Sequence, residues 1–484
     1  MAWTLQGLLR DSGIPTRSIT GDARLDGLGY DHRRITPGDL FCCWPGRVHD
    51  GHDFAADAVS RGAAALLVER PLSVDVPQAV VEEVHPLLGP LASSFFGRPT
   101  EQMTVAAITG TNGKTTVTYL LESIANHAGR SAGVIGTVSR RFAGSEEDAP
   151  RGTPEAIDVQ RLFRRMADAG SQFVAIEATS DGLAAGRLVG SRFVTAGFTN
   201  LTPDHLNTHG SMEAYFEAKA SLFDGTYTNR AVLNVDDPHG RVLIERAKGT
   251  LDVVTYGDDG DISASDVELD SDGSRARFIT PLGDVDVTTP LVGHFNIANC
   301  LCAFGIATHC GFSVDEIVAG LASLTNVPGR VERIEAGQSF LALVDYAHTP
   351  DALNNVLRAC RRLTENRLIV VFGCGGDRDR DKRPMMGRIA TELADLSIVT
   401  SDNPRSEDPQ AILDEIEAGA REGGGSYRLI VDRKEAIETA LDEARDGDVV
   451  VVAGKGHEQG QTFADRTIPF DDAAVVREHL RVAS

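Results

Sequence analysis

The stretch Ile108-Thr-Gly-Thr-Asn-Gly-Lys-Thr-Thr116 decides how the fold of this sequence is understood. It follows an apolar run, Val105–Ile108, and precedes a segment of helical character, Val117–Ile124. Strand, glycine-containing turn, Lys-Thr and helix is the order found in phosphate-binding loops, where backbone N–H groups at a helix N-terminus surround an anion. The full Walker pattern has glycine where this chain has Ile108. Taken alone, the match fits a glycine-rich turn before an ordinary helix equally well.

The functional interpretation gives each residue type in this loop a defined role. Gly110 and Gly113 allow positive φ and a close approach of the backbone to a ligand. Lys114 would reach the β- and γ-phosphates of ATP, and the hydroxyl of Thr115 would bind Mg²⁺. The predicted ATP-binding residues of this stretch are Gly110, Thr111, Asn112, Gly113, Lys114, Thr115 and Thr116.

Composition and charge exclude several classes of function. The chain has 484 residues, enough for roughly three domains. Its formal net charge of −23 argues against nucleic-acid or anionic-membrane binding, which need basic surface. The seven cysteines are scattered without paired C-x-x-C spacing, so we expect small buried hydrophobes in a reducing cytoplasm. We see no signal peptide, and no apolar run reaches the roughly 18 residues of a membrane span.

Alternating strand and helix patterns predict an α/β fold with three domains. Residues 1–98 form a small α/β unit, with a helix over 54–61 and a strand over 63–68. Residues 99–327 form a P-loop-type, mostly parallel sheet domain. Its strands are predicted at 132–135, 173–176, 194–198 and 231–234, followed by an antiparallel insertion over 262–290 and helices over 296–310 and 314–324. Residues 328–484 form a Rossmann-like, doubly wound domain. Its strands are predicted at 341–344, 368–372, 396–399, 429–431 and 449–452.

Three further positions in the middle of the chain could contribute to chemistry. Glu177 ends a strand, where a carboxylate would face a ligand crevice, although it could equally cap a helix. His205 and His209 would share a face if their segment is helical, but a structural pair is the more common explanation. Lys219 lies among apolar residues of a predicted helix and could simply extend to the surface.

Polar loops also follow successive strands of the third domain. Asp345 and His348 follow one strand, and the glycine-rich Gly373–Arg378 follows another without matching a dinucleotide fingerprint. Asp402–Arg405 and Gly454–Glu458 follow two more. Each could be an ordinary loop, but together they line the edge at which open α/β sheets bind ligands.

Taken in order, these motifs resemble the Mur ligase family over nearly the whole chain. The resemblance is carried by Gly110–Thr116, Asp204-His205, Tyr215-x-x-x-Lys219, Asn296-x-x-Asn299, Val327–Arg330, Asp345–His348, Gly373–Arg378, Asp402–Arg405 and Gly454–Glu458. It implies an N-terminal domain that binds a UDP-sugar, a central ATP-binding domain and a C-terminal amino-acid-binding domain. The implied reaction phosphorylates a substrate carboxylate with ATP, and an amine then displaces phosphate.

The resemblance also implies roles for individual residues. The catalytic residues would be Lys114, Lys219 and His205, with Lys219 matching a lysine that is carbamylated in the family. Further ATP contacts would be Asn299, Arg330, Asp345 and His348, and the Mg²⁺ ligands would be Thr115, Glu177, His205 and Lys219.

The implied substrates are UDP-muramoyl-dipeptide and meso-diaminopimelate, handled by a monomeric enzyme. Diaminopimelate differs from lysine by one carboxylate, which the guanidinium of Arg405 could bind in a bidentate fork. The amino-acid-binding set would be Arg378, Asp402, Asn403, Arg405, Gly454 and Glu458, and the acceptor-binding set Arg33, Thr153, Thr179 and Arg187.

The sequence departs from the family pattern mainly on the acceptor side. It has Asp31-His-Arg33 for Asp-Ser-Arg, Gly152-Thr153 for Thr-Thr, and Asp181 where relatives usually have histidine. Two alternatives therefore stay open: a paralogue that activates a different carboxylate, and a catalytically idle nucleotide-binding subunit. Intact Lys114, Glu177, His205 and Lys219 argue against the idle subunit.

Overall fold

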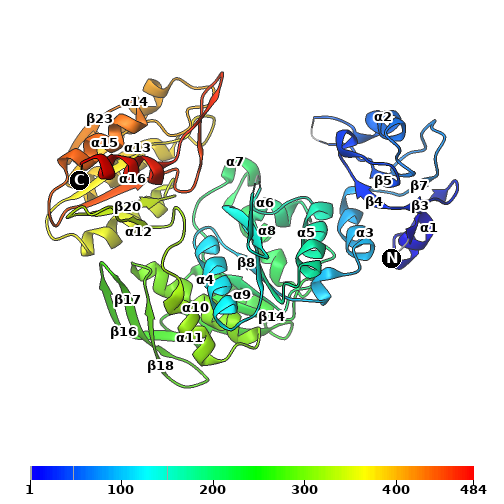
Figure 1. Cartoon of the computed structure of the whole chain (residues 1–484), viewed down its shortest axis with the longest axis horizontal. Helices are drawn as coiled ribbons and strands as arrows, with labels where there is room; N and C mark the ends of the chain where they lie inside the picture. Colours follow the sequence, from blue (N-terminus) through cyan, green and yellow to red (C-terminus); the bar gives the residue numbers. More distant parts are fainter. Residues whose placement is uncertain (1–2, 47, 150, 484) are drawn as a thin grey trace.

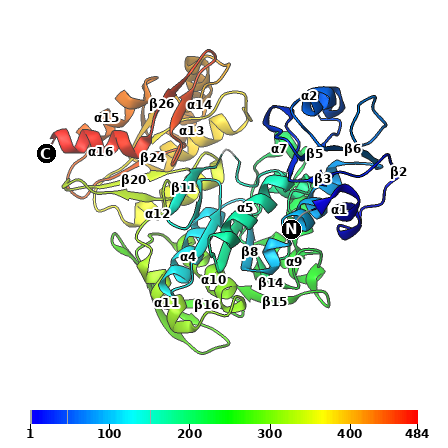
Figure 2. The same ribbon diagram turned by 45° about the vertical axis from the view of Figure 1, so that its right-hand side comes forward.

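The computed structural model describes residues 3–46, 48–149 and 151–483, which form three α/β bodies in chain order. Figure 1 shows the N-terminal body in blue, the central body in cyan and green, and the C-terminal body in yellow to red. The central body lies between the other two in this view, and Figure 2 shows the three bodies turned by 45°. The predicted three-domain α/β architecture is confirmed. Within the described ranges no helix combines the length and apolarity needed to cross a bilayer.

The N-terminal body is built on a five-stranded sheet in the order β2-β7-β6-β5-β4. All its strand pairs are parallel except β2 with β7. Its strands are β2 (Ser18–Ile19), β4 (Gly27–Gly29), β5 (Asp39–Cys42), β6 (Ala65–Val68) and β7 (Gln78–Val80), beside a short pair of β1 (Trp3–Thr4) and β3 (Arg24–Leu25). Its helices are α1 (Leu5–Asp11), α2 (Ala55–Ser60) and α3 (Leu88–Phe95). The predicted helix and strand of this body correspond to α2 and β6.

The central body contains an eight-stranded sheet in the order β11-β10-β9-β12-β8-β13-β14-β15. The strands from β9 to β15 in this order are parallel, and β10 and β11 add an antiparallel hairpin at one edge. The strands are β8 (Thr104–Thr109), β9 (Ala132–Ile135), β10 (Ser139–Phe142), β11 (Ser145–Asp148), β12 (Phe173–Glu177), β13 (Thr195–Phe198), β14 (Arg230–Asn234) and β15 (Asp252–Tyr256). The hairpin was not predicted because β11 is largely exposed and β10 has two arginines at its centre, so neither strand has a continuous apolar run.

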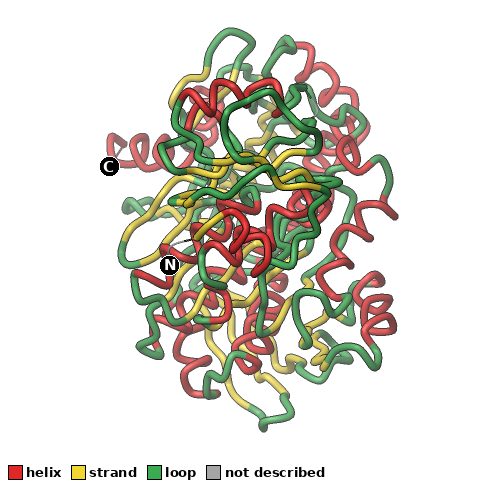
Figure 3. The backbone as a smooth tube through the Cα atoms, turned by 90° about the vertical axis from the view of Figure 1, so that its right-hand side faces the viewer, coloured by secondary structure: helices red, strands yellow, loops and turns green. Residues whose placement is uncertain are grey.

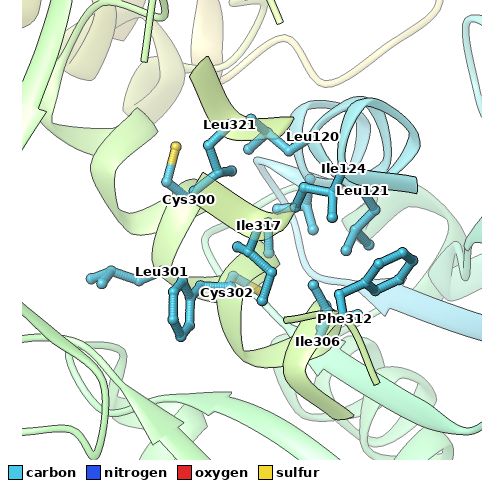
Figure 4. Packing of buried hydrophobic residues seen from close by; sticks show 14 of the residues in the cluster. Leu120, Leu121, Ile124, Cys300, Leu301, Cys302, Ile306, Phe312, Ile317 and Leu321 are labelled. Atoms are coloured by element: carbon cyan, nitrogen blue, oxygen red, sulfur yellow. The ribbon is translucent and has the colours of Figure 1, made fainter. Parts of the chain in front are cut away.

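Helix α4 (Lys114–His127) begins directly after the phosphate loop, and its packing holds that loop in place. Figure 4 shows its apolar face against α10 (His294–His309) and α11 (Val314–Ser323). The residues in this contact include Leu120, Leu121, Ile124, Cys300, Ile306, Ile317 and Leu321. Close helix packing of this kind leaves little freedom for the first turn of α4. The other helices of the body are α5 (Ala156–Asp168), α6 (Ser180–Ala184), α7 (Leu206–His209), α8 (Met212–Ala220) and α9 (Pro238–Ala247).

The antiparallel insertion predicted over 262–290 is present as a separate three-stranded sheet. It consists of β16 (Ser263–Asp270), β17 (Gly273–Ile279) and β18 (Val285–Thr289), all in antiparallel pairing. The alternation of buried and exposed residues along β17 matches a sheet with one covered face.

The C-terminal body has a six-stranded sheet in the order β19-β20-β24-β21-β22-β23, parallel except for β19. Its strands are β19 (Glu332–Ile334), β20 (Leu341–Asp345), β21 (Leu368–Phe372), β22 (Leu396–Val399), β23 (Ser426–Leu429) and β24 (Val449–Ala453), beside a hairpin of β25 (Gly460–Thr462) and β26 (Thr467–Pro469). Its helices are α12 (Pro350–Arg362), α13 (Lys382–Leu393), α14 (Pro409–Gly423), α15 (Arg433–Glu443) and α16 (Asp472–Ala483).

One predicted strand of this body is wrong. The strand expected over 429–431 ends at Leu429, because β23 occupies Ser426–Leu429. As an edge strand it alternates exposed and half-buried residues, so the apolar run that follows it was a misleading signal.

The cysteines behave as predicted, since all seven are free and buried. The tube in Figure 3 shows helices and strands connected by many loops. Several of these loops leave the carboxyl ends of parallel strands, which is where ligands bind in such sheets.

Candidate active site

The phosphate loop lies between β8 and α4, and its two glycines are required by geometry. Gly110 has φ of 146° and Gly113 has φ of 87°. A Cβ on Gly113 would lie 2.4 Å from Asn299 Oδ1, and one on Gly110 would lie 1.8 Å from Thr199 Oγ1. Ile108, the departure from the Walker pattern, is a buried residue inside β8 paired with its neighbouring strands. The isoleucine that replaces the Walker glycine is therefore part of the strand and does not alter the loop.

The side chain of Lys114 folds back over the loop. Its Nζ donates to the carbonyl oxygens of Gly110 and Thr111, at 2.9 Å each. Burial lowers the pKa of Lys114 from its ordinary value. Because both partners are neutral carbonyls, the cation is poised for an anionic ligand.

Lys219 on α8 reaches the same loop and does not extend to the surface. The residue is 1% exposed, and its Nζ donates to Gly110 O at 2.7 Å. It also lies 4.6 Å from the centre of the Tyr215 ring. Burial, reinforced by the nearby charge of Lys114, lowers the pKa of Lys219 well below its ordinary value. Two lysines thus share one carbonyl oxygen, and Lys219 is biased toward the neutral amine.

Glu177 and Thr115 form a buried group of oxygen atoms at the carboxyl ends of β12 and β8. Thr115 Oγ1 donates to Glu177 Oε1 at 2.9 Å. Thr137 donates to the same carboxylate through its backbone N–H at 3.0 Å and its hydroxyl at 2.8 Å. Glu177 does not cap the following helix, because the side chain of Thr179 caps α6. Hydroxyl and carboxylate oxygens are ligands that suit Mg²⁺, so the donor set fits that ion.

His205 and His209 do not share a helix face as the sequence suggested. α7 begins at Leu206, and His205 precedes it with a left-handed φ of 55°. His205 lies half-exposed in the cavity wall, 3.4 Å from Asp204 Oδ2. His209 is turned away and lies 3.0 Å from Ser180 Oγ and 3.3 Å from Asp181. No cluster of three His, Cys, Asp or Glu side chains suited to a metal occurs in the described part of the chain, so a metal there would also need Thr115 or Lys219.

The C-terminal body contributes Arg330 to the same place. Arg330 Nη2 donates to Thr115 Oγ1 at 3.3 Å, and its guanidinium lies 4.5 Å from the centre of the Tyr346 ring. Asp345 secures the surrounding backbone by accepting the N–H groups of Val331 and Ala347, at 2.7 Å each. Burial raises the pKa of Asp345. An arginine fixed this way can add positive charge to the phosphate site from the opposite side.

Asn299 and His348 complete the walls. Asn299 Nδ2 donates to Asn296 Oδ1 at 2.9 Å, which orients its amide toward the loop. His348 Nδ1 lies 2.9 Å from Tyr346 O, and burial lowers the pKa of His348. Together with the preceding groups they enclose a cavity of about 520 Å³. The sequence-predicted residues that line it are Thr111, Asn112, Gly113, Lys114, Thr115, Thr116, Thr153, Glu177, Thr179, Arg187, His205, Lys219, Asn299, Arg330, Asp345 and His348.

Three of the four residues predicted for the acceptor lie in this cavity. Thr153 Oγ1 donates to Glu177 O at 2.8 Å and accepts from Thr179 Oγ1 at 2.9 Å. Arg187 donates to Thr153 O at 3.2 Å and pairs with Glu155 at 2.8 Å. This wall directly adjoins the proposed metal ligand.

Arg33 is not brought to these three residues. Its side chain is 74% exposed and pairs with Asp31 at 2.8 Å on the N-terminal body. Its neighbours Asp31 and Arg34 line a second cavity, of about 400 Å³, that also includes Asp158 and Arg161 of α5.

The amino-acid candidates gather at the carboxyl ends of β21, β22 and β24, outside the large cavity. Asn403 Nδ2 donates to Glu458 Oε2 at 2.7 Å. Arg405, with φ of 52°, donates to Gly376 O at 2.7 Å, and Arg378 is exposed at the adjacent loop. Gly454 has φ of 116°, and a Cβ there would lie 2.8 Å from Asp402 Oδ2. All six predicted residues therefore sit on neighbouring loops of one sheet edge.

Sequence reasoning missed several residues that the fold places here. Thr137 binds Glu177, and Lys455 is fully buried between Asn403 and Glu458. Thr137 follows the buried strand β9, so a polar residue after a strand was the available signal. Lys455 stood inside a motif already singled out, but nothing in its local sequence indicates burial.

Comparison with known proteins agrees with this geometry. Three family models match: "Mur ligase family, catalytic domain" over residues 24–92, "Mur ligase middle domain" over 108–307, and "Mur ligase, glutamate ligase domain" over 329–456. Relatives named UDP-N-acetylmuramoyl-L-alanyl-D-glutamate--2,6-diaminopimelate ligase occur in Geobacillus thermodenitrificans and Gloeobacter violaceus. The first is 45% identical over 470 residues, covering 95% of this chain and 96% of the relative. The second is 45% identical over 484 residues, covering 99% and 98%.

Solved structures extend the comparison to the fold. A structure with the same ligase name has a TM-score of 0.70 at 34% identity and covers 95% of both chains. MurF ligase from Thermotoga maritima, solved in complex with ADP, has a TM-score of 0.65 at 20% identity, covering 94% of this chain and 97% of that one. Since family models match most of the chain and full-length relatives exceed 40% identity, this chain belongs to the Mur ligase family.

Proposed function

We propose that this protein is an ATP-dependent ligase that joins meso-diaminopimelate to UDP-N-acetylmuramoyl-L-alanyl-D-glutamate, with release of ADP and phosphate. The observation that carries the proposal is the convergence of two bodies on one cavity. The central body supplies Lys114, Glu177 and Lys219, and the C-terminal body supplies Arg330 and Asp345. The names of the full-length relatives support the choice of substrates.

The reaction needs positioning and charge neutralisation more than covalent catalysis by the protein. An oxygen of the acceptor carboxylate attacks the γ-phosphorus of ATP, the bond to the bridging oxygen breaks, and ADP leaves. The amine of diaminopimelate then attacks the acyl carbon of the acyl phosphate. A C–N bond forms, phosphate leaves with the C–O bond electrons, and the amine loses a proton. We assign to Lys114 and Arg330 the stabilisation of the negative charge that develops on the phosphoryl oxygens, and their hydrogen bonds to the phosphate loop and to Thr115 support this role.

We propose Thr115, Glu177, His205 and Lys219 as the Mg²⁺ ligands, with Mg²⁺ neutralising phosphate charge when it is bound. An ammonium at Lys219 would oppose such a metal. Burial favours the neutral amine instead, and that amine can add CO₂, forming an N–C bond and releasing a proton. The product is an anionic carbamate suited to a metal. An intact-mass or peptide-mass measurement would detect the added CO₂, and an unmodified Lys219 in active enzyme would contradict this role.

Specificity for diaminopimelate is assigned to Arg405 and its neighbours Arg378, Asp402, Asn403, Gly454 and Glu458. A guanidinium can bind the extra carboxylate that lysine lacks. Glu458 is proposed to pair with the distal ammonium. These residues lie on the loops that close one edge of the C-terminal sheet, which supports a role in amino-acid binding.

The remaining assignments follow from this scheme. We propose that Arg33, Thr153, Thr179 and Arg187 bind the acceptor, and that the domains span residues 1–98, 99–327 and 328–484. We also propose that the protein is a monomer acting in the cytoplasm, where its substrate ATP is available. The net charge of −23 supports the absence of a nucleic-acid partner.

A coupled assay tests the proposal. Purified protein is given ATP, Mg²⁺, the UDP-muramoyl-dipeptide and either meso-diaminopimelate or lysine, and phosphate release and product mass are measured. We expect turnover with diaminopimelate and a product heavier by one diaminopimelate residue. Preference for lysine would contradict the role of Arg405. Turnover only with another carboxylate would identify a paralogue, an outcome favoured by Asp181 in the cavity wall, where relatives usually have histidine. ATP binding without turnover would identify an idle subunit.

A further inference from the structure

We propose that Lys455 is a positioning residue that sets the amino-acid specificity of this ligase. It holds Asn403 and Glu458 in their binding orientation and offsets the charge of Glu458, which favours a substrate with an additional carboxylate. The inference rests on the proposed function, because it assigns Asn403 and Glu458 to the amino-acid substrate.

The contacts of Lys455 define its role. The residue is 0% exposed, and its Nζ donates to Glu458 Oε2 at 2.9 Å and to Asn403 Oδ1 at 3.1 Å. A buried ammonium needs such partners, since an unpaired charge in the interior is costly. Lys455 therefore cannot leave this position without disturbing the two residues it joins.

The amide of Asn403 is fixed by this arrangement. Its Oδ1 accepts from Lys455 and also from the backbone N–H of Thr462 at 3.0 Å. With two donors on the oxygen, the amide nitrogen faces Glu458 and donates to its Oε2 at 2.7 Å. A flipped amide would place NH₂ against an ammonium and a backbone N–H, which removes that alternative.

Glu458 is oriented in turn. The side-chain bonds recorded to its carboxylate among the described residues come from Lys455 and Asn403, and both fall on Oε2. The Glu458 side chain is 33% exposed. The Oε1 atom is therefore left to a ligand at the open side, where an ammonium group of the substrate would be its natural partner.

A second buried ion pair supports the loops that carry these residues. Arg433 pairs with Asp472 through two bonds of 2.8 and 2.7 Å, with both side chains fully buried. The same guanidinium donates to Ser401 O at 3.3 Å and Ala453 O at 3.0 Å. These carbonyls lie two residues before Asn403 and two residues before Lys455, so the ends of both loops are held by one side chain.

The charge of Lys455 also bears on the choice between diaminopimelate and lysine. Diaminopimelate has two ammonium and two carboxylate groups near neutral pH, whereas lysine carries a net positive charge. Lys455 offsets the attraction of Glu458 for a purely cationic side chain, and Arg405 lies on the neighbouring loop to bind the additional carboxylate. Removing the ammonium of Lys455 makes this site more acidic and shifts the balance toward lysine.

The test compares steady-state kinetics of wild type and Lys455→Met at saturating ATP and acceptor. We expect kcat/KM for meso-diaminopimelate to fall by about tenfold or more, mainly through KM, because Asn403 and Glu458 lose a common partner. The KM values for ATP and for the acceptor should stay within about twofold, since neither proposed site contains Lys455. The ratio of kcat/KM for diaminopimelate to that for lysine should also fall. Lys434→Met serves as the control, because this half-exposed lysine pairs with Glu438 and Glu478 on the surface of α15 and α16.

Two further variants separate positioning from a general loss of folding. Lys455→Gln retains a hydrogen-bond donor without the charge. Its KM for diaminopimelate should therefore rise less than that of Lys455→Met, but the ratio of kcat/KM for diaminopimelate to that for lysine should still fall. In the Glu458→Gln background, Lys455→Met should cost much less than in wild type, because the two residues act together. The inference is overturned if KM for ATP rises with KM for diaminopimelate, if the substrate ratio is unchanged, or if the two substitutions are additive. If the wild type does not use diaminopimelate at all, the proposed function fails instead.

Discussion

The cavity and the amino-acid site balance their charges in opposite ways. In the cavity, Lys219 is buried and Lys114 is half-buried, and both donate to Gly110 O. In the amino-acid site, Lys455 and Arg433 each pair with a carboxylate within 3 Å. In the cavity, the Nζ atoms of both lysines donate to neutral backbone carbonyl oxygens, whereas Lys455 and Arg433 are already paired with carboxylates inside the protein. The cavity is completed by its ligands, and the amino-acid site is organised before they arrive.

The largest effect should come from removing the side chain of Lys219 from the cavity. We expect Lys219→Ala to lower turnover by at least about a thousandfold, because it deletes the proposed carbamate and with it a metal ligand. Phosphate release under the assay conditions above measures the loss. Lys248→Ala, at an exposed lysine of the same body, should behave like wild type. Full activity of Lys219→Ala would refute the role of this residue and the proposed difference between the cavity and the amino-acid site.

The next effect should appear at the amino-acid site and only there. Loss of a charge-assisted bidentate contact costs about 1.5–3 kcal/mol, so Arg405→Met should lower kcat/KM for meso-diaminopimelate by roughly tenfold to a hundredfold. The KM for ATP should not change. Arg421→Met, at an exposed arginine of α14, is the matched control. An equal loss of kcat/KM with lysine as substrate would show that Arg405 does not bind the additional carboxylate.

A smaller effect is expected from alanine at Gly113 of the phosphate loop. Comparison with alanine at Gly129 distinguishes a crowded loop from backbone strain alone. Gly113→Ala and Gly129→Ala both place alanine at positive φ, 87° and 72°, which costs about 1–2 kcal/mol of stability. Only Gly113→Ala also brings its Cβ within 2.4 Å of Asn299, since nothing lies within 4 Å at Gly129. We expect the melting temperature of Gly113→Ala to be equal to or lower than that of Gly129→Ala. The KM for ATP should rise only in Gly113→Ala. An unchanged KM would mean that the loop does not need this close approach.

The smallest effect concerns acid stability of the C-terminal body. The Arg383 guanidinium hydrogen-bonds Glu407 and lowers the pKa of that carboxyl to about 2. A depressed carboxyl pKa stabilises the folded state above its ordinary value of 4.5, and this stabilisation is lost as pH falls toward 2. The difference in unfolding free energy between wild type and Glu407→Gln should therefore shrink from pH 6 to pH 3 in denaturant titrations. A difference that stays constant with pH would contradict the proposed stabilisation by Glu407. Glu422→Gln, at an exposed residue of α14, is the control.

How much of the fold could be predicted depended on burial. Strands such as β9 and β21 have every residue buried, so their apolar runs were read at the correct positions. The edge strands β11 and β23 face solvent on one side and lack that signal. The missed elements are therefore those whose stability comes from their neighbours and not from their own composition.

The candidate site divides along a similar line. Motif order was enough to select Lys114, Glu177, Lys219 and Arg330, all of which line one cavity. It did not reveal Thr137 or the burial of Lys455, and it grouped Arg33 with residues that lie elsewhere. Spacing along the chain conveys which residue types occur, but not which of them meet.

By itself the sequence determined the phosphate loop, the alternation of strands and helices, and the family to which the chain belongs, because these depend on local patterns and their order. The tertiary structure alone decided that Arg330 meets Thr115 across 215 residues and that Lys219 is buried beside Lys114. Burial and the proximity of distant charges set the pKa of a side chain, and both arise only when the chain packs.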